Sequence, residues 1–253
     1  MSEPHRFFVP TATLATEPVT ITGEALHHLR TVLRLGQGDE VLLLDGTGCC
    51  CRVRLENVGR NQAEATVLAR WAETEAPCPL RLLQALPKGD KFELVLQKGT
   101  ELGITIFQPL HSSRTVTRPE SGRQSRWERI VSEAARQSRR PRRPRLEPVR
   151  SLADALATVT EPLRLVFWEA SARPLAEVLP AAPPAGVALL VGPEGGFAAD
   201  EVMAVEAAGF VPAHLGPRIL RTETAGLAVT AVLQYLYGDW HQPARHGGDS
   251  PGG

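Results

Sequence analysis

The chain has 253 residues, of which 43% are hydrophobic, and its 28 Lys and Arg balance its 28 Asp and Glu. This size supports one large domain or two smaller ones, and no apolar run reaches the ~18–20 residues needed to cross a bilayer. Three adjacent cysteines, Cys49 to Cys51, and a distant Cys78 fit neither a disulfide framework nor a metal-ligand spacing. We therefore expect a cytoplasmic protein with reduced cysteines, no membrane span and no bound metal.

The zero net charge hides an uneven distribution along the chain. Between Arg114 and Arg150 there are 12 basic and 4 acidic residues, a local net of +8. The other 216 residues hold 16 basic and 24 acidic groups, a net of −8. Such concentrated positive charge predicts a polyanionic partner, with a solvated charged loop as the alternative.

Residues 7–71 consist of short stretches in which apolar and polar residues alternate, separated by Gly, Asn and Asp clusters. This pattern predicts β-hairpins of a small barrel, interrupted by one helix at 22–33 that begins after Thr22 as N-cap. Three leucines define the apolar face of this helix: Leu26, Leu29 and Leu33. We place the domain at residues 1–73, followed by a proline-containing linker at 74–79.

From residue 80 the pattern changes to strands that alternate with helices. The expected strands are residues 80–86, 104–110, 163–167, 187–191 and 213–215. The expected helices are residues 91–102, 124–138, 200–208 and 224–237. This alternation predicts an α/β domain with a mostly parallel sheet over residues 80–238. Residues 239–253 are rich in Gly, Pro and His and are expected to be a disordered tail.

Two loops of unusual composition follow predicted strands. Residues 192–197 read GPEGGF, and residues 215–225 read LGPRILRTETA, with Thr222 or Thr224 as a possible helix cap. Ligands of open α/β sheets bind outside the carboxyl ends of the strands, so two such loops predict a shared pocket. A plain strand-to-helix turn and a solvated arginine pair are the respective alternatives. The glycine fingerprints of dinucleotide and P-loop sites are absent from the sequence.

These two loops together resemble the signature of the RsmE family of the SPOUT superfamily. Further segments agree in order, from HLRTVLR at residues 28–34 through LQKGTELG at 96–103 to the basic stretch at 133–144. One departure concerns Arg139, which stands where similar proteins usually have Gly. The resemblance covers residues 5–238. It implies a uridine-N3 methyltransferase that acts on 16S ribosomal RNA in the 30S subunit and uses S-adenosylmethionine.

The resemblance also implies the architecture and the site. The fold is a small PUA-like β-barrel followed by a SPOUT-type α/β domain with a deep C-terminal trefoil knot, and the protein is a homodimer. The residues expected to bind the cofactor are Trp168, Gly192, Gly195, Gly196, Leu215, Gly216, Leu220 and Thr222. Those expected to bind RNA are Arg30, Arg34, Arg114, Arg139, Arg140 and Arg142.

The catalytic residues are expected in the two loops. N3 of uracil is protonated at neutral pH, so its methylation requires removal of that proton. We expect Glu194 or Glu223 to accept it, Arg221 or Arg218 to orient the base, and these arginines to stabilise the negative charge that develops on it. For Glu194 an ordinary ion pair within the loop is the alternative. For the whole chain, the alternatives are a ribose 2′-O or tRNA methyltransferase of the same superfamily, and a noncatalytic ribosome-assembly protein.

Overall fold

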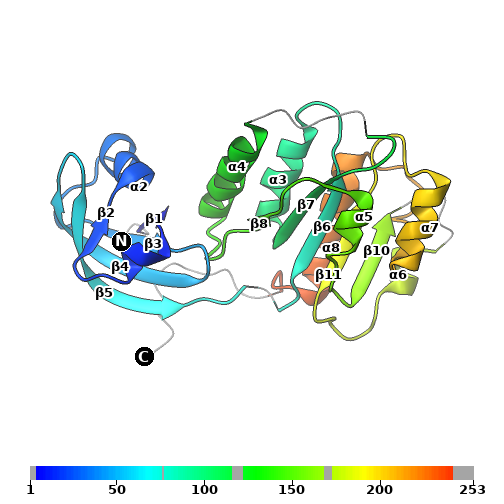
Figure 1. The fold of residues 1–253 in the computed structure, drawn as a ribbon. Helices are drawn as coiled ribbons and strands as arrows, with labels where there is room; N and C mark the ends of the chain where they lie inside the picture. Colours follow the sequence, from blue (N-terminus) through cyan, green and yellow to red (C-terminus); the bar gives the residue numbers. More distant parts are fainter. Residues whose placement is uncertain (1–3, 76, 116–121, 168–172, 242–253) are drawn as a thin grey trace. The chain divides into compact units, whose positions relative to one another are not determined.

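The computed structural model describes residues 4–75, 77–115, 122–167 and 173–241 (Figure 1). The chain forms two compact units. The first contains residues 4–75 together with residues 135–143, and the second contains the other described residues. Most of the expected tail and the predicted cofactor residue Trp168 lie outside the described residues.

The first unit is built on one five-stranded sheet in the order β1-β3-β4-β5-β2. Its strands are β1 (His5–Phe8), β2 (Val19–Ile21), β3 (Glu40–Leu44), β4 (Cys49–Val58) and β5 (Ala63–Ala72), with a short helix α1 (Thr11–Leu14) after β1. Strand β1 runs parallel to β3, and the other neighbours are antiparallel. Two register shifts between β4 and β5 allow the sheet to bend, as a barrel requires.

The predicted helix at 22–33 is two elements, α2 (Gly23–His27) and a π-helical turn, η1 (His28–Val32). Its apolar face is confirmed, because Leu26 and Leu29 are buried in the core of the first unit. Thr22 is the N-cap residue of α2, as predicted, although its side chain makes no capping hydrogen bond. Arg34 follows the turn with a left-handed φ of 56°.

The four cysteines are free, as predicted. Cys50 and Cys51 are fully buried in β4, and Cys78 is buried in the second unit. Burial raises the pKa of Cys50 to about 12, so its thiol stays protonated at neutral pH. Among the described residues there is no group of His, Cys, Asp and Glu with the geometry of a metal site.

The second unit is a parallel sheet in the order β12-β10-β11-β6-β7-β8, with β9 beside β7. Its strands are β6 (Leu80–Ala85), β7 (Ile106–His111), β8 (Arg145–Leu146), β9 (Arg150–Ser151), β10 (Leu163–Phe167), β11 (Val187–Val191) and β12 (Val211–Ala213). Its helices are α3 (Lys91–Glu101), α4 (Arg123–Gln137), α5 (Leu152–Leu156), α6 (Leu175–Val178), α7 (Ala199–Ala207) and α8 (Thr222–Tyr237). The predicted parallel α/β organisation is confirmed, while β8, β9, α5 and α6 were not anticipated.

Helices cover both faces of this sheet (Figure 1). Alternate side chains of β6 and β11 point to opposite faces, so Leu82 belongs to one core cluster and Leu83 to the other. The first cluster includes apolar side chains of α3, α4 and α8, and the second those of α5 and α7. No helix in the described part of the chain has the length and apolarity to span a membrane.

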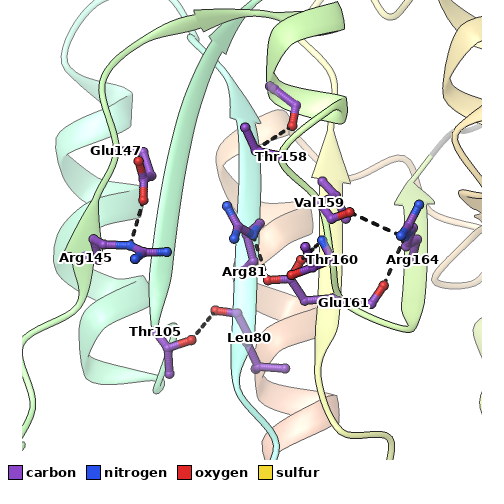
Figure 2. Close-up of polar contacts among 11 residues, drawn as sticks. Leu80, Arg81, Thr105, Arg145, Glu147, Thr158, Val159, Thr160, Glu161 and Arg164 are labelled. Atoms are coloured by element: carbon purple, nitrogen blue, oxygen red, sulfur yellow. Dashed lines mark hydrogen bonds and ion pairs between the residues drawn. The ribbon is translucent and has the colours of Figure 1, made fainter.

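A polar cluster secures the sheet near the amino ends of its strands (Figure 2). Arg81 of β6 donates to Glu161 at 2.7 Å, and both side chains are almost buried. Arg164 of β10 donates to the carbonyl groups of Val159, Glu161 and Ala208. A buried ion pair is favourable only when both charged groups have partners. Here Arg81 and Glu161 pair with each other, and backbone carbonyl groups satisfy the neighbouring Arg164.

Candidate active site

A pocket of about 620 Å³ opens where β10, β11 and β12 end. The last residues of these three strands, Phe167, Val191 and Ala213, form part of its wall. Both loops that the sequence predicted to share a pocket line it, together with Lys91 at the start of α3. The pocket therefore lies at the carboxyl edge of the sheet, as expected for an α/β domain.

Glycines shape the floor of the pocket. Gly196 and Gly216 have φ values of 66° and 100°, and a Cβ at either position would meet open space. An added Cβ at Gly192 would lie 3.0 Å from the ring of Phe197, so the loop folds closely over that side chain. Left-handed backbone without side chains lets a ligand approach the main chain directly.

Most of the predicted cofactor residues surround the pocket. The lining includes Gly192, Gly196, Leu215, Gly216, Leu220 and Thr222. Gly195 is not part of the lining, and its carbonyl accepts a hydrogen bond from Arg114 at 2.7 Å. Arg114 was predicted to bind RNA, so the structure adds a contact with the glycine-rich loop that the sequence did not suggest.

Thr222 joins the two pocket loops. Its hydroxyl donates to the carbonyl of Gly192 and accepts a hydrogen bond from the buried amide of Gln84 at 2.9 Å. Helix α8 starts at Thr222 after Arg221 as N-cap, without a side-chain capping bond. The prediction that Thr222 or Thr224 caps this helix is therefore wrong, because the Thr222 hydroxyl is used between loops.

A charged cluster occupies one side of the pocket. The Lys91 ammonium lies 3.3 Å from Glu194 and 3.6 Å from Glu223. Glu223 is only 8% exposed, and its Oε2 atom has no hydrogen-bond partner. Arg221 lies 4.0 Å from Glu223 and is largely exposed, as is Arg218. The four predicted catalytic residues thus gather around one pocket, together with a lysine.

The two glutamates differ in their surroundings. Burial alone raises the pKa of Glu194, but hydrogen bonds from its own N–H, the Lys88 N–H and Lys91 outweigh it, so the pKa lies below its usual value. A carboxylate stabilised by several donors is a poor proton acceptor. Glu223 has fewer donors, since its Oε2 atom has no hydrogen-bond partner and the nearest cations, Lys91 and Arg221, lie 3.6 and 4.0 Å from Oε1.

Sequence reasoning missed Lys91 and Gln84. Both residues reach the pocket because β6 lies next to β11 in the sheet. Gln84 is near the end of β6, and Lys91 follows shortly after that strand. Lys91 is one of only three lysines among 28 basic residues, which was the available signal. Gln84 is fully buried in β6, and a buried amide is a sign of a specific partner.

Five of the six predicted RNA-binding arginines lie in two places within the first unit, and Arg114 belongs to the second unit. Arg30 and Arg34 border a shallow, polar hollow beside Gln37, Glu56 and Asn57. Residues 135–143 pack on the same unit, because the N–H of Arg143 donates to the carbonyl of Gly46. The unit therefore carries basic residues from two distant parts of the sequence.

The predicted RNA-binding arginines within residues 135–143 differ in their surroundings. Arg139 and Arg142 are exposed, and Arg139 adopts a left-handed φ of 60°. Arg140 is only 9% exposed, and it forms two hydrogen bonds of 2.8 and 2.7 Å with the carboxylate of Glu75. This placement argues against the predicted RNA contact of Arg140, because its guanidinium group already holds the segment in place.

Comparison with known proteins agrees with this architecture. Residues 74–234 match the family model of an RNA methyltransferase domain, and residues 21–68 match that of an RNA methyltransferase PUA domain. Ribosomal RNA small subunit methyltransferase E of Synechocystis is 36% identical, with 92% of this chain and 78% of that protein covered. The Mycobacterium bovis protein of the same name is 34% identical, with 94% of each chain covered.

A solved structure is similar over almost its whole length. Ribosomal RNA small subunit methyltransferase E of Neisseria gonorrhoeae, bound to S-adenosylmethionine, is 34% identical and superimposes with a TM-score of 0.84. The match covers 94% of this chain and 99% of that chain. Sequence, domain content and fold thus agree. The chain belongs to the ribosomal RNA small subunit methyltransferase E family.

Proposed function

We propose that this protein methylates N3 of one uridine in 16S ribosomal RNA, with S-adenosylmethionine as the methyl donor and the 30S subunit as substrate. The observation that carries the proposal is the pocket at the carboxyl edge of the sheet. The similar protein of Neisseria gonorrhoeae was solved with S-adenosylmethionine bound. The protein would work in the cytoplasm, where ribosomes are assembled.

The residues of the pocket fit the proposed cofactor. A volume of about 620 Å³ is within the range of small-molecule sites. Apolar walls from Phe167, Leu215 and Leu220 suit an adenine ring, and the open backbone at Gly196 and Gly216 offers amide and carbonyl groups. When bound, S-adenosylmethionine supplies an electrophilic methyl group on a sulfonium centre.

The chain itself must deal with the proton on N3. We assign proton removal to Glu223, whose carboxylate is desolvated and receives few hydrogen bonds. Arg218 and Arg221 are exposed at the mouth of the pocket, where they suit the negative charge that develops on the uracil oxygens. Glu194 is assigned to loop structure, because donors from two segments already stabilise its carboxylate.

RNA binding is assigned to the basic residues outside the pocket. Arg30, Arg34, Arg139 and Arg142 are exposed on the first unit, and Arg114 borders the glycine-rich loop. Arginine suits phosphate contacts and stacking on unpaired bases. A PUA-like domain at residues 1–73 would then hold the RNA, and the linker at 74–79 would join it to a catalytic domain at 80–238.

We further propose the knotted topology of the SPOUT superfamily for the catalytic domain. Its support is the chain path after the edge strand β12: α8 returns to pack against α3, β6 and β11 at the centre of the sheet. The start of α8 is also connected to the loop after β11, because the Thr222 hydroxyl donates a hydrogen bond to the carbonyl of Gly192.

A homodimer is the proposed state, because one side of α8 stays apolar and uncovered. Val232, Tyr235 and Leu236 are exposed there, with Tyr235 68% exposed, and Trp240 follows the helix. An apolar patch of this kind on a surface helix marks an interaction site, and a second copy of the same helix would cover it.

The modified nucleotide is the direct test of the function. Unmodified 30S particles are incubated with the protein and S-adenosylmethionine, and the 16S RNA is then reverse transcribed. N3 methylation blocks the pairing edge, so we expect a strong stop at a single uridine. A ribose 2′-O-methyl group leaves that edge free, and a purely binding protein transfers no methyl group, so either result would replace the proposal.

The assignment of the base predicts different effects for two matched substitutions. We expect Glu223→Gln to reduce the single-turnover rate by about 100-fold or more, because general base catalysis contributes on the order of 10²–10⁴. Glu194→Gln should reduce it far less, and Glu206→Gln on the exposed face of α7 serves as the control. Near-normal rates for both Glu223→Gln and Glu194→Gln would eliminate a carboxylate base.

The RNA assignment predicts a change in salt dependence. The double variant Arg139→Gln/Arg142→Gln should lower the slope of log affinity against log salt by roughly 0.7–0.9 for each phosphate group that the variant no longer neutralises. The double variant Arg52→Gln/Arg54→Gln is the matched control, since both arginines pair with Glu40 in the same unit. An unchanged slope would place the RNA elsewhere on the protein.

The dimer proposal predicts that Tyr235→Glu produces a monomer in light scattering, while the unchanged protein has twice the chain mass of 27.4 kDa. A charge in the centre of an apolar interface costs several kcal/mol in desolvation. Leu94→Glu, at a 44% exposed position on α3, is the control and should leave the mass unchanged. A monomeric unchanged protein would refute the dimer.

A further inference from the structure

We propose that Lys91 is a positioning residue of the methyl-transfer site, and that it acts by holding the carboxylate of Glu223 in place. This inference rests on the proposed function and adds a third segment, the start of α3, to the two loops. The family signature in those loops does not contain this lysine.

The geometry makes Lys91 the link between three segments. Its Nζ atom lies within 3.6 Å of carboxylate oxygens from the loop after β11 and from the first turn of α8. The backbone N–H of Lys88, three residues earlier, donates to the same Glu194 oxygen at 3.1 Å. The turn between β6 and α3 therefore contacts Glu194 through the main chain and through the lysine.

The charges around Lys91 explain why a cation is needed there. Two carboxylates approach one nitrogen, and without it they would repel one another across a partly desolvated space. Arg221 lies farther from Glu223, at 4.0 Å, and its side chain is 81% exposed, so solvent weakens its effect. Arg218 also lines the pocket and is exposed, as is Lys88, whose backbone N–H contacts Glu194.

Lys91 also constrains which Glu223 oxygen stays unpaired. Its ammonium approaches Oε1, whereas Oε2 is buried without a hydrogen-bond partner. Only Oε1 is therefore held by a cation, and the orientation of the carboxylate depends on that contact. A lysine on a flexible stem can keep this contact while a substrate enters, since it retains further N–H donors.

The first test compares Lys91→Met with Lys91→Arg in the full-length protein. We expect Lys91→Met to lower the single-turnover rate on 30S particles by about tenfold or more, with the Kd for S-adenosylmethionine changed less than about threefold. Lys91→Arg, which keeps the charge, should restore most of the rate. Lys98→Met is the matched control, because Lys98 pairs with Glu101 on the same helix. A weaker Kd with an unchanged rate would make Lys91 a cofactor ligand and overturn the inference.

A double-mutant cycle identifies the partner through which Lys91 acts. In a Glu223→Gln background, Lys91→Met should reduce the remaining rate no further, because the carboxylate it orients is gone. In a Glu194→Gln background it should keep its full effect. Equal effects in both backgrounds would indicate a general loss of structure and contradict the assignment.

A measurement without RNA keeps the inference separate from the proposed function. The side-chain carboxyl ¹³C shift of Glu194 is followed as pH is varied, in the unchanged protein and in Lys91→Met. Lys91 helps to keep the pKa of Glu194 low, so its removal should move the titration midpoint to higher pH. An unmoved midpoint would show that the Lys91 ammonium does not lie beside the Glu194 carboxylate, and would refute the inference even if methylation occurs. A moved midpoint in a protein that methylates no uridine would refute the function alone.

Discussion

The parallel sheet of the second unit is the constraint on which the site depends. In a parallel sheet every strand has its carboxyl end at the same edge, so the last residues of β10, β11 and β12 line one pocket together with the loops after β11 and β12. Helices on both faces bury every residue of β6 and β11, and β11 is accordingly a continuous apolar run, while Arg81 and Gln84 of β6 have buried polar partners. The buried pair of Arg81 and Glu161 stabilises the opposite edge.

Within this frame, polar contacts between segments decide the shape of the pocket. Gln84 and Thr222 connect β6, α8 and the loop at Gly192, while Arg114 supports the same loop at Gly195. Each of these contacts joins residues at least 30 positions apart. The shape of the pocket therefore depends on contacts between several segments of the second unit. These contacts also hold the pocket loops in the conformation in which Gly196 and Gly216 have positive φ.

Much of the fold could be predicted because hydrophobic periodicity is local. The strands at Leu163–Phe167 and Val187–Val191 agree with the sequence prediction, and the major helices of the second unit agree within two residues. The short elements α5, α6, β8 and β9 were missed because two to five residues carry too little periodicity. The π-helical turn after α2 was missed because its one leucine, Leu29, fits an α-helical pattern with Leu26 and Leu33 equally well.

The sequence by itself determined the family, the α/β class, the two loops that each contain Gly-Pro, and the concentration of arginine, because each of these is a pattern of neighbouring residues. Only the tertiary structure decided how those residues are used. It placed Lys91 between Glu194 and Glu223. It also joined the Thr222 hydroxyl to the carbonyl of Gly192 by a hydrogen bond, and buried Arg140 in an ion pair with Glu75. Such pairings depend on distances between segments that are remote in the chain, and local patterns contain no information about them.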